Sequence, residues 1–137
     1  MEIAQIFIPI ITAIIGYILG RFEFLYKEKR TQLKTQFLEL YLPLQKFLID
    51  VNPEEKTFSS LYSEIQADIV DMLIDKYEYA ESDLKNLIVK FHSTFVKDPY
   101  NTDAVTTLDN EFFELIKCVK RDYNKLAKKL FYPTIKN

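Results

Sequence analysis

An uncharged apolar segment near the N-terminus constrains this chain more than any other feature. Residues 3–20 contain no Asp, Glu, Lys or Arg, although 28% of the whole sequence is charged. In a helix, about eighteen residues cover about 27 Å, close to the roughly 30 Å hydrocarbon core of a bilayer. The segment therefore predicts a transmembrane helix, and we assign residues 1–21 to it.

Signal peptides and buried core helices also contain apolar segments of this kind. A secretory signal peptide has a basic region before the apolar run and a small-x-small cleavage site after it. The chain begins Met1-Glu2, has no Lys or Arg before the run and has no Ala-x-Ala-like site behind it, so we do not expect cleavage. A core helix of a soluble protein stays open as an alternative, because eighteen residues is about the lower limit for spanning.

The basic side chains predict the orientation of the span. No Lys or Arg precedes it, and cytoplasmic flanks are enriched in these residues. We therefore expect a single-pass protein of the inner (plasma) membrane, with a short N-terminus outside and the rest of the chain in the cytoplasm. The predicted membrane-surface residues follow the span: Arg21, Lys27, Lys29, Arg30 and Lys34.

Small and polar residues of the span recur along one side of the predicted helix. The only two glycines of the chain are four residues apart, the small-xxx-small spacing that lets membrane helices approach closely. This pattern predicts a homo-oligomer, and it leaves open whether the stripe seals a contact or lines a pore. A chance placement of the glycines is the alternative. The stripe consists of Gln5, Pro9, Thr12, Ala13, Gly16 and Gly20.

Beyond the span, apolar residues follow helical spacing in four segments. The sequence predicts helices over about 22–50, 58–79, 83–97 and 103–131, with a kink near Pro43, whose ring clashes with the carbonyl of Glu39. Thr57 or Ser59 is expected to cap the second helix. We therefore predict an all-α protein: the transmembrane helix continues into a cytoplasmic antiparallel four-helix bundle over residues 22–137.

Charge is distributed unevenly along the cytoplasmic part. Residues 51–110 carry five basic and twelve acidic side chains, whereas residues 111–137 carry seven basic and three acidic ones. In an up-down-up-down bundle the last helix returns toward the membrane. We therefore expect part of this basic tail to face the anionic leaflet, which attracts Lys and Arg: Lys125, Lys128, Lys129 and Lys136.

The sequence holds no pattern typical of an enzyme. It has no His-Glu-x-x-His motif, no Cys pair and no glycine-rich phosphate loop, so we expect no metal, no cofactor and no catalytic residue. Cys118 falls in an apolar stripe and is interpreted as a buried structural thiol. His92 is interpreted as a residue at the border of the core. The row Asp68, Asp71, Asp75 and Glu78 is interpreted as a solvated face.

One basic set of the last predicted helix is a candidate ligand site. Cationic side chains along one side of a helix suit the phosphates of a nucleotide or oligonucleotide signal. A face that contacts solvent or lipid headgroups is the alternative. The set consists of Lys117, Lys120, Arg121 and Lys128.

The whole layout resembles small single-pass membrane effectors of bacterial anti-phage defence, including those of the Hailong type. The likeness lies in the glycine-containing span, the basic exit and a helix with Leu40-Tyr41-Leu42-Pro43-Leu44 that heads a small helical domain. It implies an effector that oligomerises through its span and opens a pore, governed by a nucleic-acid signal from a partner nucleotidyltransferase.

The sequence therefore predicts a homo-oligomeric membrane effector or channel subunit, gated through its cytoplasmic bundle. The alternative is a membrane-tethered module without pore activity that binds a cytoplasmic regulatory protein or a nucleotide signal.

Overall fold

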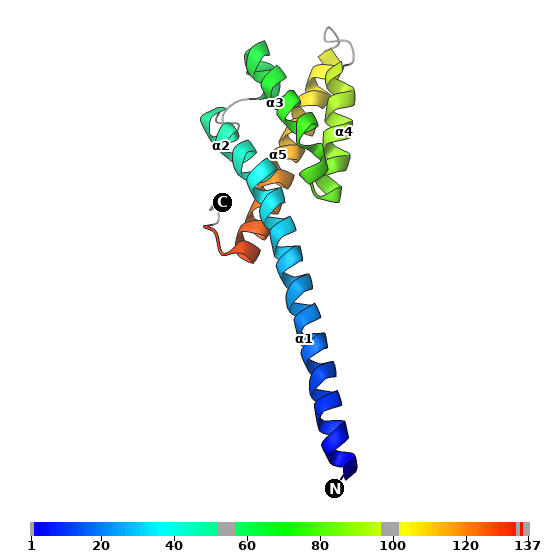
Figure 1. The fold of residues 1–137 in the computed structure, drawn as a ribbon. Helices are drawn as coiled ribbons and strands as arrows, with labels where there is room; N and C mark the ends of the chain where they lie inside the picture. The colour runs from blue at the N-terminus through cyan, green and yellow to red at the C-terminus, as the bar shows by residue number, and fades with distance from the viewer. Residues whose placement is uncertain (1, 52–56, 97–101, 134, 136–137) are drawn as a thin grey trace. The chain divides into compact units, whose positions relative to one another are not determined.

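The computed structural model describes residues 2–51, 57–96, 102–133 and 135, and every regular element among them is helical (Figure 1). This confirms the all-α prediction for the described residues. The chain divides into two compact units, Met1–Leu33 (unit 1) and Lys34–Asn137 (unit 2).

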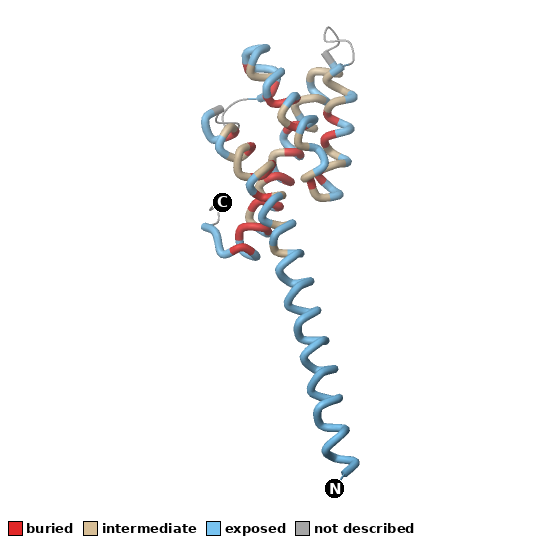
Figure 2. The backbone as a smooth tube through the Cα atoms, in the orientation of Figure 1, coloured by how far each residue is buried: buried red, intermediate tan, exposed pale blue. Residues whose placement is uncertain are grey.

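Unit 1 is built from the greater part of one helix, α1 (Glu2–Gln36). Pro9 lies inside this helix, where its ring removes one backbone donor. Among the described residues of unit 1, all but Arg30 and Leu33 are exposed (Figure 2). The helix contains an 18-residue window with a mean hydropathy of 2.1, long and apolar enough to cross a membrane.

A wide helical turn begins unit 2's core. The π-helical turn η1 (Phe37–Tyr41) follows α1 and leads into α2 (Leu42–Val51). The amide of Leu42 donates to the carbonyl of Phe37, five residues back rather than four. Pro43 has no amide hydrogen and needs space near the carbonyl of Glu39, which explains a widened turn at this place. The predicted distortion near Pro43 is thus a π-turn immediately before the proline.

The helix predicted over 58–79 is instead split into three elements: the 3₁₀-turn η2 (Phe58–Ser60), α3 (Ser63–Asp75) and the 3₁₀-turn η3 (Tyr77–Tyr79). Leu61 and Tyr62 are extended, with ψ angles of 150° and 145°.

Polar side chains around η2 explain this interruption. Ser59 donates from its amide and its hydroxyl to the carboxylate of Asp109, at 2.8 and 2.7 Å. These bonds hold η2 against α5, so α3 starts afresh at Ser63. The expected capping by Thr57 or Ser59 is wrong, because the residue before α3 is Tyr62 and makes no side-chain cap.

The last two helices are α4 (Ser82–Val96) and α5 (Thr102–Leu130). Their bounds lie within one residue of the predicted ones. α5 contacts α4, α2, η1 and η2, so it is the central helix of unit 2. Figure 2 shows the buried residues gathered along these contacts.

Two groups of aromatic rings lie in the core of unit 2. The ring of Phe58 lies 4.9 Å from Phe91, 4.9 Å from Phe112 and 5.9 Å from Phe95, measured between centroids. A second group joins η1 to the end of α5, because Phe37 stacks on Tyr132 at 5.1 Å and contacts Tyr123 at 4.9 Å. These rings are structural, whereas Phe7, Phe22 and Tyr62 are examples of aromatic side chains that are more than half exposed.

α5 ends in a capping motif with an unusual residue. The amide of Tyr132 donates to the carbonyl of Ala127, and the amide of Phe131 donates to that of Lys128. These two bonds define a Schellman motif, whose left-handed position usually holds glycine. Here it holds Phe131, with φ at 62°. A side chain at this position is strained.

Candidate functional site

The predicted stripe of the span lies wholly on the surface of α1. All six residues are exposed: Gln5, Pro9, Thr12, Ala13, Gly16 and Gly20. The hydroxyl of Thr12 donates to the carbonyl of Ile8 at 2.8 Å, so this polar group is satisfied within the helix. A Cβ atom added at Gly16 or Gly20 would meet nothing within 4 Å. No packing within the described chain therefore requires these glycines.

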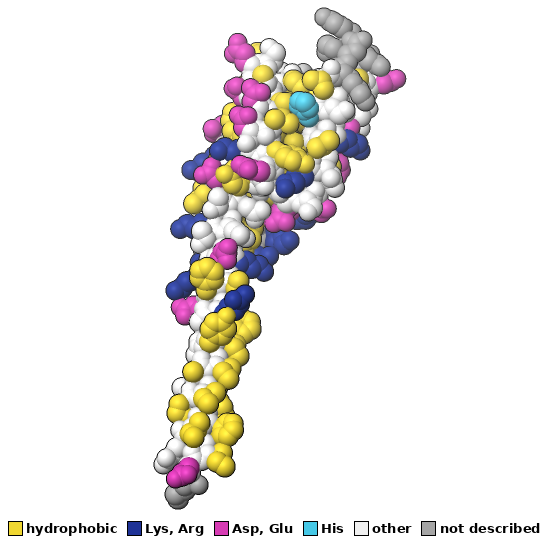
Figure 3. Space-filling model, turned by 45° about the vertical axis from the view of Figure 1, so that its right-hand side comes forward, with side chains coloured by type: hydrophobic (Ala, Val, Ile, Leu, Met, Phe, Trp, Pro, Cys, Tyr) yellow, Lys and Arg dark blue, Asp and Glu magenta, His cyan; other side chains and the backbone are white. Residues whose placement is uncertain are grey.

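The apolar surface around this stripe is extensive. Fifteen large hydrophobic side chains between Ile3 and Tyr26 are 45 to 71% exposed. Figure 3 shows hydrophobic side chains along the N-terminal part of the helix, with Lys and Arg beginning beyond it. A core helix of a soluble protein would be mostly buried, whereas none of the apolar window is buried.

The basic residues that follow the apolar window are also on the surface. Arg21, Lys27, Lys29 and Lys34 are exposed and Arg30 is half-buried. Lys27 pairs with Glu23 one turn before it, at 3.1 Å. Such an exposed pair on one helix contributes little to stability, so Lys27 remains available to a charged surface.

The candidate ligand residues of the last helix lie on one face of α5. They line a groove of about 730 Å³ whose lining belongs to α5 alone. Three further residues that the prediction did not include in the ligand set, Asn124, Lys125 and Lys129, also line it. We call this surface the basic face of α5: Lys117, Lys120, Arg121, Asn124, Lys125, Lys128 and Lys129.

The two ends of the basic face differ in charge pairing. Near its start, Lys117 lies 3.8 Å from Glu114, and Arg121 lies 3.3 Å from Asp83 of α4. Lys125, Lys128 and Lys129, near its end, are exposed and form no ion pair within the described residues. The positive potential therefore increases toward the C-terminal end of α5, the end that a helix dipole makes negative.

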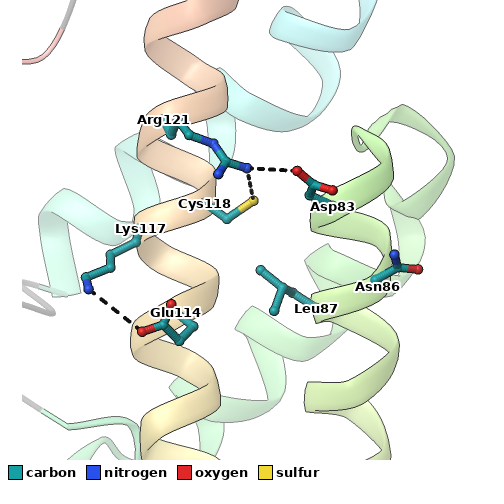
Figure 4. Close-up of a pocket in the computed structure, with 7 residues that line it drawn as sticks. All are labelled: Asp83, Asn86, Leu87, Glu114, Lys117, Cys118 and Arg121. Carbon is teal, nitrogen blue, oxygen red and sulfur yellow. Dashed lines mark hydrogen bonds and ion pairs between the residues drawn. The ribbon is translucent and has the colours of Figure 1, made fainter.

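A second cleft opens between α4 and α5. It has a volume of about 460 Å³ and shares Lys117 and Arg121 with the basic face. Figure 4 shows Arg121 directed toward Asp83, whereas Lys117 extends away from α4 to Glu114. Opposite charges thus already compensate one another in this cleft. Its lining is Asp83, Asn86, Leu87, Glu114, Lys117, Cys118 and Arg121.

Behind this cleft lies a buried carboxylate that the sequence analysis missed. Asp122 is 4% exposed and is the one charged residue among the buried residues that the structure describes. Its Oδ2 accepts from the hydroxyl of Tyr41 at 3.3 Å and from the thiol of Cys118 at 3.6 Å, and its Oδ1 lies 3.6 Å from Nε of Arg121. These partners offset the cost of burying a charge.

Tyr41 connects this carboxylate to two other elements. Its hydroxyl also accepts from the amide of Glu81, at 2.9 Å, just before α4. Next to it, Lys76 at the end of α3 pairs with Glu39 of η1 at 3.0 Å. The π-turn is therefore bonded to α5, to the start of α4 and to the end of α3.

Cys118 is buried, at 5% exposure, which confirms the prediction of a structural thiol. Burial, followed by the negative charge of Asp122, raises the pKa of the Cys118 thiol to about 11. Burial likewise raises the pKa of the Tyr41 hydroxyl well above its usual value. Both groups stay protonated at neutral pH and serve as hydrogen-bond donors to the carboxylate.

A sequence signal for Asp122 does exist. It lies four residues after Cys118 and four before Leu126, on the same side of the helix as these buried residues. A single acidic residue inside an apolar stripe indicates a buried charge with partners. Those partners come from separate parts of the chain, so the sequence alone did not identify them.

The remaining predicted features lie outside the core. Asp68, Asp71, Asp75 and Glu78 are exposed, as expected of a solvated face. Within the described residues no group of three or more His, Cys, Asp and Glu side chains could hold a metal ion. His92 is half-buried, at the border of the core. Lys136 lies outside the described residues.

Comparison of the chain with models of protein families, with curated proteins and with solved structures finds no match.

Proposed function

We propose that this chain is the subunit of a homo-oligomeric membrane effector or channel, gated through a cytoplasmic antiparallel four-helix bundle. Residues 3–20 anchor it in the inner membrane, with the N-terminus outside. The resemblance to Hailong-type effectors is the reason to propose anti-phage defence as its setting.

One observation carries the membrane part of the proposal. The fifteen hydrophobic side chains from Ile3 to Tyr26 form a surface that the described residues leave exposed. Exposed apolar patches beyond a few hundred Å² mark membrane or protein contacts. Its uncharged part, residues 3–20, is about as long as a bilayer core is thick and is followed by Arg21, Lys27 and Lys29, which favours lipid.

The two glycines support self-association of the span. Substitutions at Gly16 and Gly20 cost nothing in packing inside the described chain. Glycines at this spacing allow two membrane helices to approach closely. A contact between copies is the use that we propose for them.

Contacts within unit 2 support the antiparallel arrangement of the bundle. Asp83, at the start of α4, pairs with Arg121 late in α5, whereas Phe91, later in α4, contacts Phe112 earlier in α5. Matching a later residue of one helix with an earlier residue of the other is the order expected of antiparallel neighbours.

The π-turn supports the proposal that the bundle gates the span. η1 follows α1 directly in the chain and is bonded to three other elements through Tyr41 and Glu39. A shift of α4 or α5 therefore strains the turn that continues the membrane helix. π-turns often lie at functional places in helices.

The test replaces both glycines with leucine in the full chain. Gly16→Leu/Gly20→Leu fills the proposed contact without a clash inside the protomer. We expect the oligomer to dissociate in mild detergent, measured by mass photometry or light scattering. The matched control, Ile14→Leu/Ile18→Leu, puts leucine on the opposite side at the same spacing and should leave the mass unchanged. An unchanged mass of the glycine variant would disprove this oligomer contact.

Pore activity is tested separately. Proteoliposomes that contain the wild-type chain should conduct ions in planar-bilayer or dye-release measurements, and the Gly16→Leu/Gly20→Leu variant should not. If the wild-type oligomer does not conduct ions, whether the bundle is intact or perturbed, pore activity is disproved and the span serves only as an anchor.

The exposed acidic row of α3 favours a second candidate function. Asp68, Asp71 and Asp75 offer a negatively charged helix face to a basic regulatory protein. In this candidate the chain is a tethered interaction module without a pore. Replacing residues 3–20 with an unrelated transmembrane helix would preserve the function of such a module, and it would abolish that of a channel.

A further inference from the structure

The end of α5 combines unpaired positive charge with an exposed aromatic ring. Lys125, Lys128 and Lys129 are exposed, and none forms an ion pair within the described residues. The next turn carries Phe131, whose side chain is 83% exposed. A large apolar ring beside lysines is typical of segments that lie on membrane surfaces.

The backbone conformation of Phe131, which exposes the ring, is strained. Phe131 occupies the left-handed position of the Schellman motif, where glycine is the usual residue. Strained positions of this kind cluster at functional places, where the surrounding structure holds them. Here Tyr132 holds the turn, because it bonds to Ala127 and stacks on Phe37 at 5.1 Å.

Ile135, which follows the exposed ring in the chain, is also bonded to α5. Asn124 receives a bond from the amide of Ile135 at 2.9 Å and donates to its carbonyl at 3.2 Å. The turn at Phe131 is therefore fixed both before and after the exposed ring. Phe37, at the beginning of unit 2, contacts Tyr123 and Tyr132. Phe131 therefore lies at the same end of unit 2 as Phe37.

We propose that Lys125, Lys128, Lys129 and Phe131 form a docking surface for an anionic lipid bilayer, separate from the transmembrane segment. The lysines attract acidic headgroups and Phe131 inserts among them. The proposal rests on the membrane anchorage proposed above, because a tethered domain meets the leaflet at high effective concentration and a weak surface contact then suffices.

Three observations favour a lipid surface over an enclosed phosphate ligand. Among the described residues, the lining of the basic face comes from one helix, so no opposite wall surrounds a ligand there. Arg121, the residue with the geometry for bidentate phosphate binding, is already paired with Asp83. The residues without pairs are lysines, which act as point charges toward a plane of headgroups.

The absence of tryptophan from the chain permits a direct test. Phe131→Trp, in the full chain, places a single fluorophore at the proposed insertion point. We expect blue-shifted emission and about twofold quenching by brominated lipids in proteoliposomes of phosphatidylcholine with 30% phosphatidylglycerol, as for an interfacial ring. Phosphatidylcholine alone, or high salt, should return the emission to that of a ring in water.

Two variants complete the measurement. Tyr62→Trp places the probe at another residue of unit 2 that is 81% exposed, and its emission should not depend on the lipid. In the Phe131→Trp background, the triple substitution Lys125→Gln/Lys128→Gln/Lys129→Gln should abolish the blue shift. Each lysine is expected to contribute about fivefold to the affinity for the acidic lipid. All three lysines are exposed, and circular dichroism checks the fold. The salt titration uses the Phe131→Trp chain with all lysines present, so it still tests the proposal if the triple lysine variant is unstable.

The outcomes separate the docking surface from the function proposed above. Emission from Phe131→Trp that is the same in both lipids, or a Tyr62→Trp probe that shifts equally, would overturn the docking. Quenching by a short oligothymidylate without lipid, together with no response to phosphatidylglycerol, would assign the face to nucleic acid instead. Oligomer mass and conductance are measured on the same samples, and carbonate extraction reports a failed anchor, so each failure is recognised independently.

Discussion

The two units of this chain treat their apolar side chains in opposite ways. In unit 2, Leu40, Leu44 and Phe58 are fully buried, because several helices cover one another. In unit 1, Ile3, Phe7 and Ile14 are more than half exposed. The hydrophobic effect acts equally on both. Unit 2 buries its apolar side chains by itself, whereas those of α1 stay exposed among the described residues, as the proposed contact with lipid or with another copy of the chain would require.

The positions of the glycines show a similar contrast between the two units. The left-handed position at the end of α5, where glycine would relieve strain, holds Phe131. Both glycines of the chain are instead in α1, where no φ angle or neighbouring atom of the described chain requires them. Glycine lowers helix stability in water by about 1 kcal/mol relative to alanine. Its use in α1 is consistent with a contact outside the protomer.

The largest effect expected from this comparison is the loss of membrane insertion. Ile11→Lys/Ile14→Lys puts two charges near the centre of the apolar window, at a cost of about 5–7 kcal/mol in insertion free energy. We expect the chain to leave the carbonate-resistant membrane fraction. The control Ile49→Lys/Ile74→Lys changes two exposed isoleucines of unit 2 and should remain in the membrane. A double lysine variant of the span that stays inserted would contradict the assignment of unit 1.

A core substitution in unit 2 should affect stability and leave insertion unchanged. Phe58 is fully buried and its ring contacts three other phenylalanines. Phe58→Ala should therefore lower the free energy of unfolding by about 3–5 kcal/mol. Denaturant titration in detergent, followed by near-ultraviolet circular dichroism, measures the change. Tyr62→Ala, at a residue 81% exposed, should change it by less than about 0.5 kcal/mol. Equal effects of both variants would refute the assigned core.

Alkaline pH should destabilise unit 2 through its buried thiol. The pKa of Cys118 is raised to about 11 from an ordinary value of 9.0. The unfolded chain therefore loses this proton first, and stability falls as pH rises from about 9 to 11, by up to roughly 2 kcal/mol. Tyr41 acts in the same direction at higher pH.

Unfolding midpoints between pH 7 and 11 measure this alkaline change. Cys118→Ser keeps a donor for Asp122 and removes the titration, so it should flatten the profile between pH 9 and 11. A wild-type profile that is already flat, or one unchanged by this substitution, would show that the thiol is not its source.

The smallest effect concerns the strained cap. Phe131→Gly relieves the left-handed conformation and should stabilise unit 2 by about 0.5–1 kcal/mol, seen as a rise in the thermal midpoint. The same variant removes the proposed lipid contact. Phe131→Ala removes the ring and keeps the strain, so it separates the two effects. A Phe131→Gly variant less stable than Phe131→Ala would contradict the strain.

Several features of the fold followed from the sequence because they depend on neighbours along one helix. Apolar spacing of three and four residues predicted α4 and α5 within one residue, and it predicted the burial of Cys118. It failed over 58–79, where the bonds from Ser59 to Asp109 of α5 interrupt the helix. Periodicity records which side of a helix is apolar, and it contains no information about a partner fifty positions away.

The candidate site shows the same division. The spacing of Lys117, Lys120, Arg121 and Lys128 placed these residues on one side of a helix, and they do line one groove. The sequence did not reveal that Asp83 already neutralises Arg121, or that the unpaired charge lies nearer the helix end. Pairing across helices depends on the packing angle and register of α4 and α5, which local sequence does not determine.

By itself, the sequence determined the apolar window of α1, the helical class of the chain and the separation of acidic and basic segments, since each is a property of consecutive residues. Tertiary structure alone decided the burial of Asp122 with Tyr41 and Cys118 and the exposure of Phe131. Both depend on which distant groups meet. A buried carboxylate needs donors from other elements, and a strained turn persists only where packing such as that of Phe37 on Tyr132 holds it.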